Sequence, residues 1–98
     1  MTASLGRLMI DDATVLRFPP HVKFRFDATR DRWVVLAPER LLLPDEMSIE
    51  ILQLLDGERS VDAMIDALAA KFDAPRAEIA SDVKTLLQDL ADKGTVVG

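Results

Sequence analysis

The chain changes character at residues 33–40, which read Trp33-Val34-Val35-Leu36-Ala37-Pro38-Glu39-Arg40. The first four of these residues are aromatic, β-branched or aliphatic, which is typical of a β-strand. Pro38 ends that strand, because proline cannot donate a ladder hydrogen bond. Before this stretch the hydropathy alternates as it does in strands, and from residue 45 onward it repeats at helical spacing. The sequence therefore predicts a sheet followed by helices.

Two further strands are predicted on either side of this run. Residues 21–27 alternate between apolar and polar side chains, which is the pattern of a half-buried strand. The apolar side chains of that strand are Val22, Phe24 and Phe26. A corner at Pro38-Glu39 lets residues 40–43 return as a short third strand, which ends at Pro44. We expect an antiparallel sheet in which Trp33 contributes a large apolar side chain to the core.

Three helices are predicted in the second half. The first helix runs from its cap, Asp45, to Leu55, and Ser60 caps the second helix. The third helix spans residues 75–93 and is stopped by Gly94. The apolar stripes expected to face the core are Met64, Ile65, Leu68, Ala69 and Phe72 in the second helix, and Ile79, Val83, Leu86, Leu87 and Leu90 in the third. The order βββααα, with a short turn between the last two helices, predicts an α+β fold of the winged helix-turn-helix type.

A domain boundary is predicted at Phe18-Pro19-Pro20, because proline fixes the backbone and favours extended geometry in the residue before it. We expect residues 18–98 to form one winged-helix domain. Residues 1–17 are apolar but follow no clear period. They are expected to form an amino-terminal extension that is either mobile or docked on the domain or on a neighbouring subunit.

The residue inventory excludes most kinds of active site. The chain has no cysteine, no tyrosine and a single histidine, His21, so it has no thiol chemistry and no second strong ligand for a transition metal. It has no glycine-rich phosphate loop. No two of its carboxylates have a spacing that suggests a general acid and a general base acting together. We therefore predict a binding protein that is not an enzyme and that uses no metal or cofactor. No export signal or membrane-spanning run is visible, so a cytoplasmic location is expected.

Charge separates the two halves of the chain. Residues 1–44 carry seven Lys and Arg against five Asp and Glu, whereas residues 45–98 carry five against twelve. A nucleic-acid binder needs a basic face to neutralise phosphates, and the third helix is acidic. We therefore predict no nucleic-acid partner, although a winged-helix DNA-binding regulator remains the alternative function. A structural subunit with an obligate partner is a third possibility.

Four segments, taken in order, resemble one family. They are Arg32-Trp33-Val34-Val35-Leu36-Ala37-Pro38-Glu39, Ile51-Leu52-x-Leu54-Leu55-Asp56-Gly57, Ser60-Val61, and Asp82-Val83-x-x-Leu86-Leu87-x-x-Leu90. Over residues 19–97 this combination resembles the PqqD family of pyrroloquinoline quinone (PQQ) biosynthesis. The resemblance implies a peptide chaperone and recognition element for ribosomally made, modified peptides. Such a protein would bind the precursor peptide PqqA and present it to the radical S-adenosylmethionine (SAM) enzyme PqqE.

A surface for that peptide is expected on the third strand and the third helix. An edge strand offers free backbone N–H and C=O groups to an incoming extended peptide, and a neighbouring apolar groove would select its side chains. The candidate peptide-binding residues are Arg40, Leu41, Leu42, Leu43, Lys84, Thr85, Leu86, Asp89 and Leu90. Instead of contacting a peptide, the leucines could pack in the core, and the polar residues could lie on a solvent-exposed face of the helix. We expect a monomer, for which the open edge also permits a strand-exchanged dimer.

Overall fold

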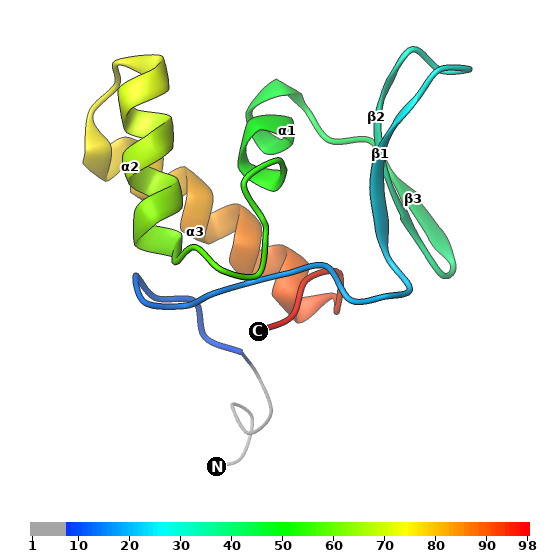
Figure 1. The fold of residues 1–98 in the computed structure, drawn as a ribbon, viewed down its shortest axis with the longest axis horizontal. Helices are drawn as coiled ribbons and strands as arrows, with labels where there is room; N and C mark the ends of the chain where they lie inside the picture. The colour runs from blue at the N-terminus through cyan, green and yellow to red at the C-terminus, as the bar shows by residue number, and fades with distance from the viewer. Residues whose placement is uncertain (1–7) are drawn as a thin grey trace.

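The computed structural model describes residues 8–98 and confirms the predicted order of three strands and three helices (Figure 1). The elements are β1 (Lys23–Asp27), β2 (Arg32–Ala37), β3 (Arg40–Leu42), α1 (Glu46–Leu52), α2 (Val61–Phe72) and α3 (Arg76–Asp92). Figure 1 shows the sheet at one side of the molecule and α2 at the other, with α1 between them and α3 behind. This is the predicted α+β arrangement.

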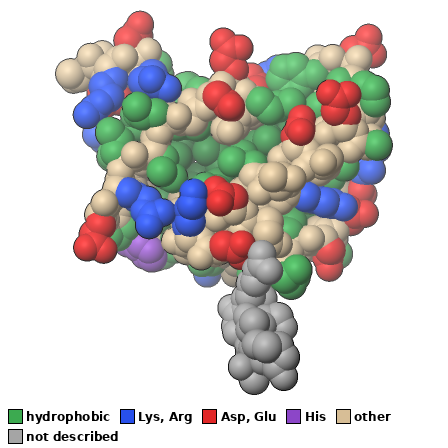
Figure 2. Space-filling view, turned by 180° about the vertical axis from the view of Figure 1, so that it is seen from behind, with side chains coloured by type: hydrophobic (Ala, Val, Ile, Leu, Met, Phe, Trp, Pro, Cys, Tyr) green, Lys and Arg blue, Asp and Glu red, His purple; other side chains and the backbone are tan. Residues whose placement is uncertain are grey.

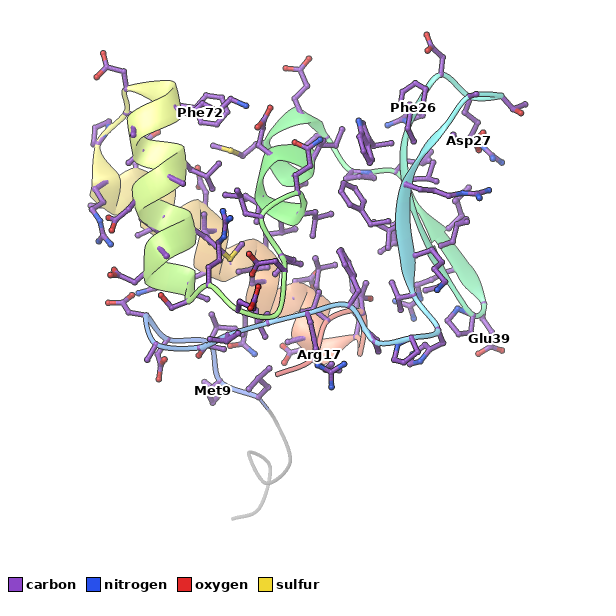
Figure 3. The ribbon with its side chains drawn as sticks, in the orientation of Figure 1. Met9, Arg17, Phe26, Asp27, Glu39 and Phe72 are labelled. Carbon is purple, nitrogen blue, oxygen red and sulfur yellow. The ribbon has the colours of Figure 1, made fainter. Side chains whose placement is uncertain are left out.

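The sheet is antiparallel throughout, in the order β1-β2-β3. Its register aligns Phe24 with Val35 and Val35 with Leu42, so these three side chains share the face that packs on the core. Phe26 lies on the same face, where the alternation predicts burial, but it is 48% exposed. It lies near the tip of the β1–β2 hairpin in Figure 3, away from the helices.

Trp33 lies at the margin of the core and not at its centre. It is half-buried, and its ring stacks on Phe24, with 4.8 Å between ring centroids. Phe24 stacks in turn on Phe18 at 5.8 Å. Trp33 therefore buries its apolar surface mainly against other aromatic rings, in a row that joins it to Phe24 and Phe18.

The helix caps lie where the sequence places them. The Asp45 carboxylate accepts a hydrogen bond from the Ser48 N–H at 2.8 Å, and the Ser60 hydroxyl accepts one from the Ala63 N–H at 3.2 Å. The first helix, however, ends at Leu52 and not at Leu55. The N–H groups of Leu54 and Leu55 bond to carbonyls three residues back, so the chain tightens into turns before Asp56.

The core lies between the helices and the sheet. Its buried side chains include Val35 of β2, Ile51 of α1, Met64, Ile65 and Leu68 of α2, and Ile79, Val83, Leu87 and Leu90 of α3. Two members of the predicted stripes depart from it: Leu86 is only partly buried, and Phe72 is 41% exposed at the end of α2. Arg76, at the start of α3, bonds to Asp62 and Asp66 of α2, which fixes the two helices at that end.

The segment before Phe18 packs on the domain from residue 8 onward. Leu16 is 1% exposed and belongs to the core. Arg17 and Val97 exchange two backbone hydrogen bonds of 2.9 Å each, and the carbonyl of Thr14 accepts from the Val61 N–H at 2.8 Å. The described residues before Phe18 are therefore packed on the rest of the domain. The remainder of the expected extension, residues 1–7, lies outside the described residues.

Candidate functional site

The outer edge of β3 is open within residues 8–98. The strand pairs with β2 through Leu42 with Val35, Leu41 with Leu36 and Arg40 with Ala37, and it is the last strand of the sheet. An edge of this kind presents backbone donors and acceptors in a row that another extended chain can pair with.

The three leucines after Arg40 differ in their surroundings. Leu42 is half-buried against the core, on the same side as Val35. Leu41 points to the opposite face of the sheet and is 38% exposed, while Leu43 is 49% exposed. An outward leucine is therefore present, but Leu42, the one on the helix side, also packs on the core.

A hollow of about 550 Å³ lies between α1 and α3. Its lining residues are Asp45, Met47, Ser48, Ile51, Asp82, Thr85, Leu86 and Asp89. Figure 2 looks onto this side of the molecule and shows hydrophobic side chains in a hollowed area, with both acidic and basic side chains around them. Because Asp45 follows β3 after only two residues, the hollow begins where the open edge ends.

The structure divides the candidate residues of α3 into three groups. Thr85, Leu86 and Asp89 line the hollow. Leu90 is only 5% exposed and belongs to the core, because it lies on the buried stripe one turn after Leu87. Lys84 lies on the flank of the helix, where its ammonium forms an ion pair of 2.6 Å with Asp12. Leu90 and Lys84 are therefore not part of the hollow between α1 and α3.

The α1 side of this hollow is not predicted from the sequence. Asp45 is predicted there only as the cap of the first helix, and Met47 and Ile51 are apolar residues at helical spacing within it. The signal that could have found them is the short connection through Pro44, which forces the start of α1 to lie beside the end of β3. Asp82 adds a carboxylate that has no ion pair within residues 8–98.

The two ends of this surface differ in their charged side chains. At the corner between β2 and β3, a smaller hollow of about 260 Å³ is lined in part by His21, Glu39, Arg40 and Lys93, and Lys93 is paired with Asp89 at 2.9 Å. At the other end stand Asp45 and Asp82. The N–H of Ser48, which donates to the Asp45 carboxylate, holds the pKa of Asp45 below its usual value, so this group is ionised at neutral pH.

Two kinds of site are not found in the described part of the chain. Within residues 8–98 no group of three His, Cys, Asp or Glu side chains is arranged to hold a metal ion. None of the helices in that range combines the length and the apolar run needed to cross a bilayer. The surface combines an open strand edge with an apolar hollow bordered by carboxylates, which together suit the binding of an extended chain.

Comparison with known proteins gives the family. The family described as "Coenzyme PQQ synthesis protein D (PqqD)" matches residues 32–96. A "PqqA binding protein" of Rhodopseudomonas palustris strain BisB5 is 59% identical over 87 residues, covering 89% of this chain and 85% of the relative. Another, from strain HaA2, is 66% identical over 76 residues, covering 78% of this chain and 74% of the relative.

Two solved structures share the fold. The solution structure of the PqqD part of Methylobacterium extorquens PqqCD, described as a functional and stand-alone recognition element, superposes with a TM-score of 0.77 at 34% identity. It covers 91% of this chain and 95% of that one. The crystal structure of PqqD from Xanthomonas campestris superposes with a TM-score of 0.54 at 36% identity, and the match covers 86% of this chain and 93% of that one. The Rhodopseudomonas palustris relatives are named for PqqA binding and the Methylobacterium extorquens protein for recognition, which supports a binding protein and not an enzyme. On the matched residues, the shared identity and the common fold, this chain belongs to the PqqD family.

Proposed function

We propose that this protein is a peptide chaperone of PQQ biosynthesis that binds the precursor peptide PqqA as an added strand beside β3. The relatives are named for PqqA binding. The observation that carries the binding mode is the open edge of β3, which leads directly into the hollow between α1 and α3. Backbone pairing along β3 would fix the register of the peptide, and the hollow would accept its side chains.

The contacts expected from this geometry are a subset of the sequence candidates together with the α1 wall. The backbone of residues 40–43 would pair with the peptide, and Thr85, Leu86 and Asp89 would contact its side chains across from Met47. Leu90 would act through packing alone, because it is covered by the core. Arg40 lies at the corner between β2 and β3, has no ion pair within residues 8–98, and can pair with a carboxylate of the peptide.

A titration with synthetic PqqA tests this binding mode. In amide NMR spectra, the signals of residues 40–43 and 85–89 should move, and hydrogen exchange of the β3 amides should slow as they gain partners. β1 is the control, because it forms the other edge of the same sheet and contributes no residue to the lining of the hollow. Unchanged spectra at high micromolar peptide, or changes confined to β1, would contradict strand addition at β3.

Delivery to the radical SAM enzyme PqqE is the second part of the proposal. A protein without catalytic groups contributes to a pathway by holding its substrate in an accessible, extended form, and a strand bound at an open edge stays exposed on one side. Pull-down of the protein by PqqE with and without PqqA should show a complex of all three. If PqqE modifies PqqA at the same rate in the absence of this protein, the delivery role is wrong. A cytoplasmic location remains a prediction.

The DNA-binding alternative has no support in the charge of α3. The helix that a winged-helix regulator would place in the major groove carries Glu78, Asp82 and Asp89, which would repel phosphates. A gel-shift assay at low salt with genomic fragments should show no binding. A shift that weakens as salt is added would support the regulator instead.

A further inference from the structure

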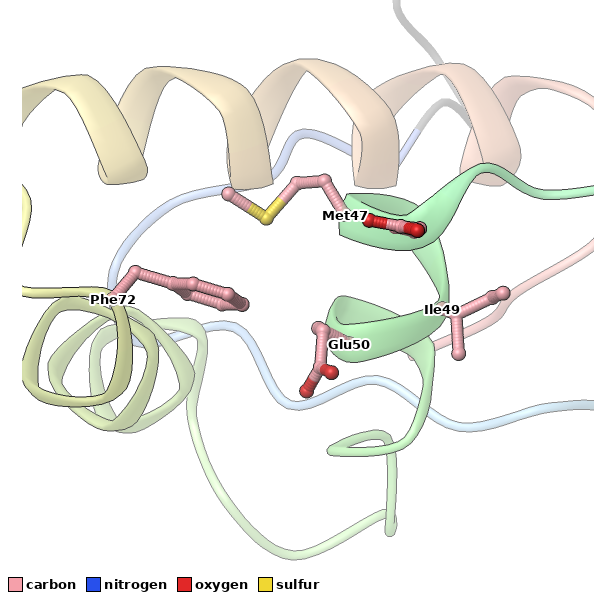
Figure 4. A pocket seen from close by; sticks show the side chains of 5 residues that line it. Met47, Ile49, Glu50 and Phe72 are labelled. Carbon is pink, nitrogen blue, oxygen red and sulfur yellow. The ribbon is translucent and has the colours of Figure 1, made fainter.

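A second apolar pocket, separate from the hollow between α1 and α3, opens between α1 and the end of α2 (Figure 4). Its volume is about 310 Å³, and it is lined by Glu46, Met47, Ile49, Glu50 and Phe72. In Figure 4 the Phe72 ring and the Met47 side chain reach toward each other across it. This volume lies at the small end of ligand pockets, so it suits one or two side chains better than a whole ligand.

Phe72 is placed for contact and not for core packing. It continues the apolar stripe of α2, yet it is 41% exposed because the helix ends there at Asp73, which adopts a left-handed conformation with φ of 50°. Exposing a large aromatic side chain forgoes the stabilisation that its burial would give. An exposed aromatic side chain at the wall of a pocket is a common form of binding contact.

The charges around the pocket leave one carboxylate free. Lys71 forms an ion pair with Glu50, which connects the end of α2 to α1 and neutralises that side of the rim. Glu46 has no ion pair within residues 8–98. The neighbouring hollow contributes Asp45 and Asp82, so the approach to the pocket from α3 is negatively charged.

Met47 makes the pocket continuous with the proposed peptide site, because its side chain lines both. A chain leaving the edge of β3 past the start of α1 therefore meets the α1–α3 hollow first and the Phe72 pocket next. No residue within residues 8–98 other than Met47 lines both the pocket and that hollow. This continuity favours, as the occupant of the pocket, the same chain that is proposed to bind the hollow.

We propose that the Phe72 pocket binds an aromatic or long aliphatic side chain of the precursor peptide, in the segment that continues beyond the residues paired with β3. This inference rests on the proposed function. The acidic approach favours a Lys or Arg near that apolar side chain, since the cation would pair with Glu46 or Asp82. Backbone pairing by itself discriminates little between peptide sequences. The pocket would add a side-chain anchor that does discriminate between them.

The substitution Phe72→Ala tests the anchor, with Phe26→Ala as its matched control. Both phenylalanines are about half-exposed, and Figure 3 shows them on opposite sides of α1. Calorimetric titration with PqqA should show affinity reduced about 5- to 10-fold for Phe72→Ala and changed by less than about twofold for Phe26→Ala. Phe72→Leu should keep most of the affinity, because it retains an apolar side chain. Thermal unfolding checks that all variants stay folded.

A truncated peptide separates this inference from the proposed function. The truncated PqqA lacks the segment that continues beyond the residues paired with β3. If its affinity for the wild type is as low as the affinity of full-length PqqA for Phe72→Ala, the two losses have one cause and the anchor is supported. If the wild type does not bind PqqA at all, the proposed function fails. If it binds and Phe72→Ala binds equally well, only the anchor is wrong.

A spectroscopic readout identifies other occupants. With fluorine-labelled phenylalanine, the Phe72 signal should move on addition of full-length PqqA and stay in place with the truncated peptide. Movement with PqqE alone would assign the pocket to the enzyme, and movement with protein concentration alone would assign it to a second copy. Either result would overturn the proposal.

Discussion

At the residue scale, burial separates side chains that the sequence presents as equivalent. Leu86 and Leu90 lie one turn apart on α3, and both are leucines of one apolar stripe. Leu90 is 5% exposed inside the core, whereas Leu86 is partly buried and lines the hollow. The neighbours of each residue, and not its type, decide whether it can contact a guest peptide.

This difference predicts two distinct phenotypes. Leu90→Ala should lower the free energy of unfolding by about 2 to 4 kcal/mol, because it leaves a cavity in the packed core. Leu86→Ala should cost about 1 kcal/mol or less and should weaken PqqA binding several-fold. Urea unfolding and calorimetric titration of both variants measure the two effects. A stable Leu86→Ala variant with wild-type affinity would exclude the hollow as the peptide site.

The cap of α1 gives a prediction for pH. The Ser48 N–H bond holds the pKa of Asp45 below its usual value, so the ionised carboxylate stabilises the folded state at neutral pH. That contribution is present above about pH 4, the range of an unperturbed Asp, and is lost as the pH falls through the lower pKa of the folded state. Asp45→Ala should cost about 1 kcal/mol at pH 7 and less at acidic pH.

Ser60→Ala is the matched control for this measurement. Ser60 caps α2 with a hydroxyl that does not titrate, so its removal should cost about the same amount at every pH at which the protein is folded. Urea unfolding of both variants at pH 7 and near pH 3 makes the comparison. Equal pH dependence for the two would mean that the Asp45 charge does not contribute.

At the element scale, the segment before Phe18 acts as part of the domain. Gln88 of α3 holds it at one end: the side-chain oxygen accepts from the Ile10 N–H at 3.0 Å and the amide group donates to the Leu8 carbonyl at 2.8 Å. Arg17 holds it at the other end through Val97. The segment thereby joins α3 to the C-terminal tail, and in Figure 1 it runs along the lower side of the molecule, beneath the helices and toward the sheet.

Two substitutions in this segment test that role. Leu16→Ala should destabilise the protein by about 2 to 4 kcal/mol, since the side chain is fully buried among core residues. Met9→Ala should change stability by less than about 0.5 kcal/mol, because Met9 is 57% exposed. Thermal unfolding of both is the measurement. A Leu16→Ala variant as stable as Met9→Ala would show that the domain holds together without this segment.

At the scale of the whole molecule, the open strand edge makes self-association and peptide binding compete. The chain of 10.9 kDa is expected to be a monomer, and a strand-exchanged or edge-paired dimer would use the same backbone groups of β3 as PqqA. Light scattering after gel filtration should show a monomer at micromolar concentration, and any dimer formed at higher concentration should dissociate when PqqA is added. A dimer that binds PqqA without dissociating would place the peptide elsewhere.

The charge of the whole molecule also follows from the arrangement of its two halves. The net charge is −5, and five of the twelve acidic residues of the helical half line the hollow or the Phe72 pocket, namely Asp45, Asp82, Asp89, Glu46 and Glu50. Of the Lys and Arg residues in the described part of the sheet half, Arg40 alone lines the hollow at the corner between β2 and β3, where Glu39 stands beside it. A peptide bound along this surface therefore meets mainly carboxylates at the α1–α3 hollow, which favours a basic segment there.

The sequence by itself determined the elements of this protein. Alternation at residues 21–27, the prolines at 38 and 44, the caps Asp45 and Ser60, and the stop at Gly94 act through neighbours a few residues away, so they can be read locally. Only the tertiary structure decided which of Leu41, Leu42 and Leu43 faces the helices, that Leu16 fills the core, and that Phe72 and Met47 form a pocket. Those outcomes depend on how distant segments pack against one another, and no spacing along a single element encodes that arrangement.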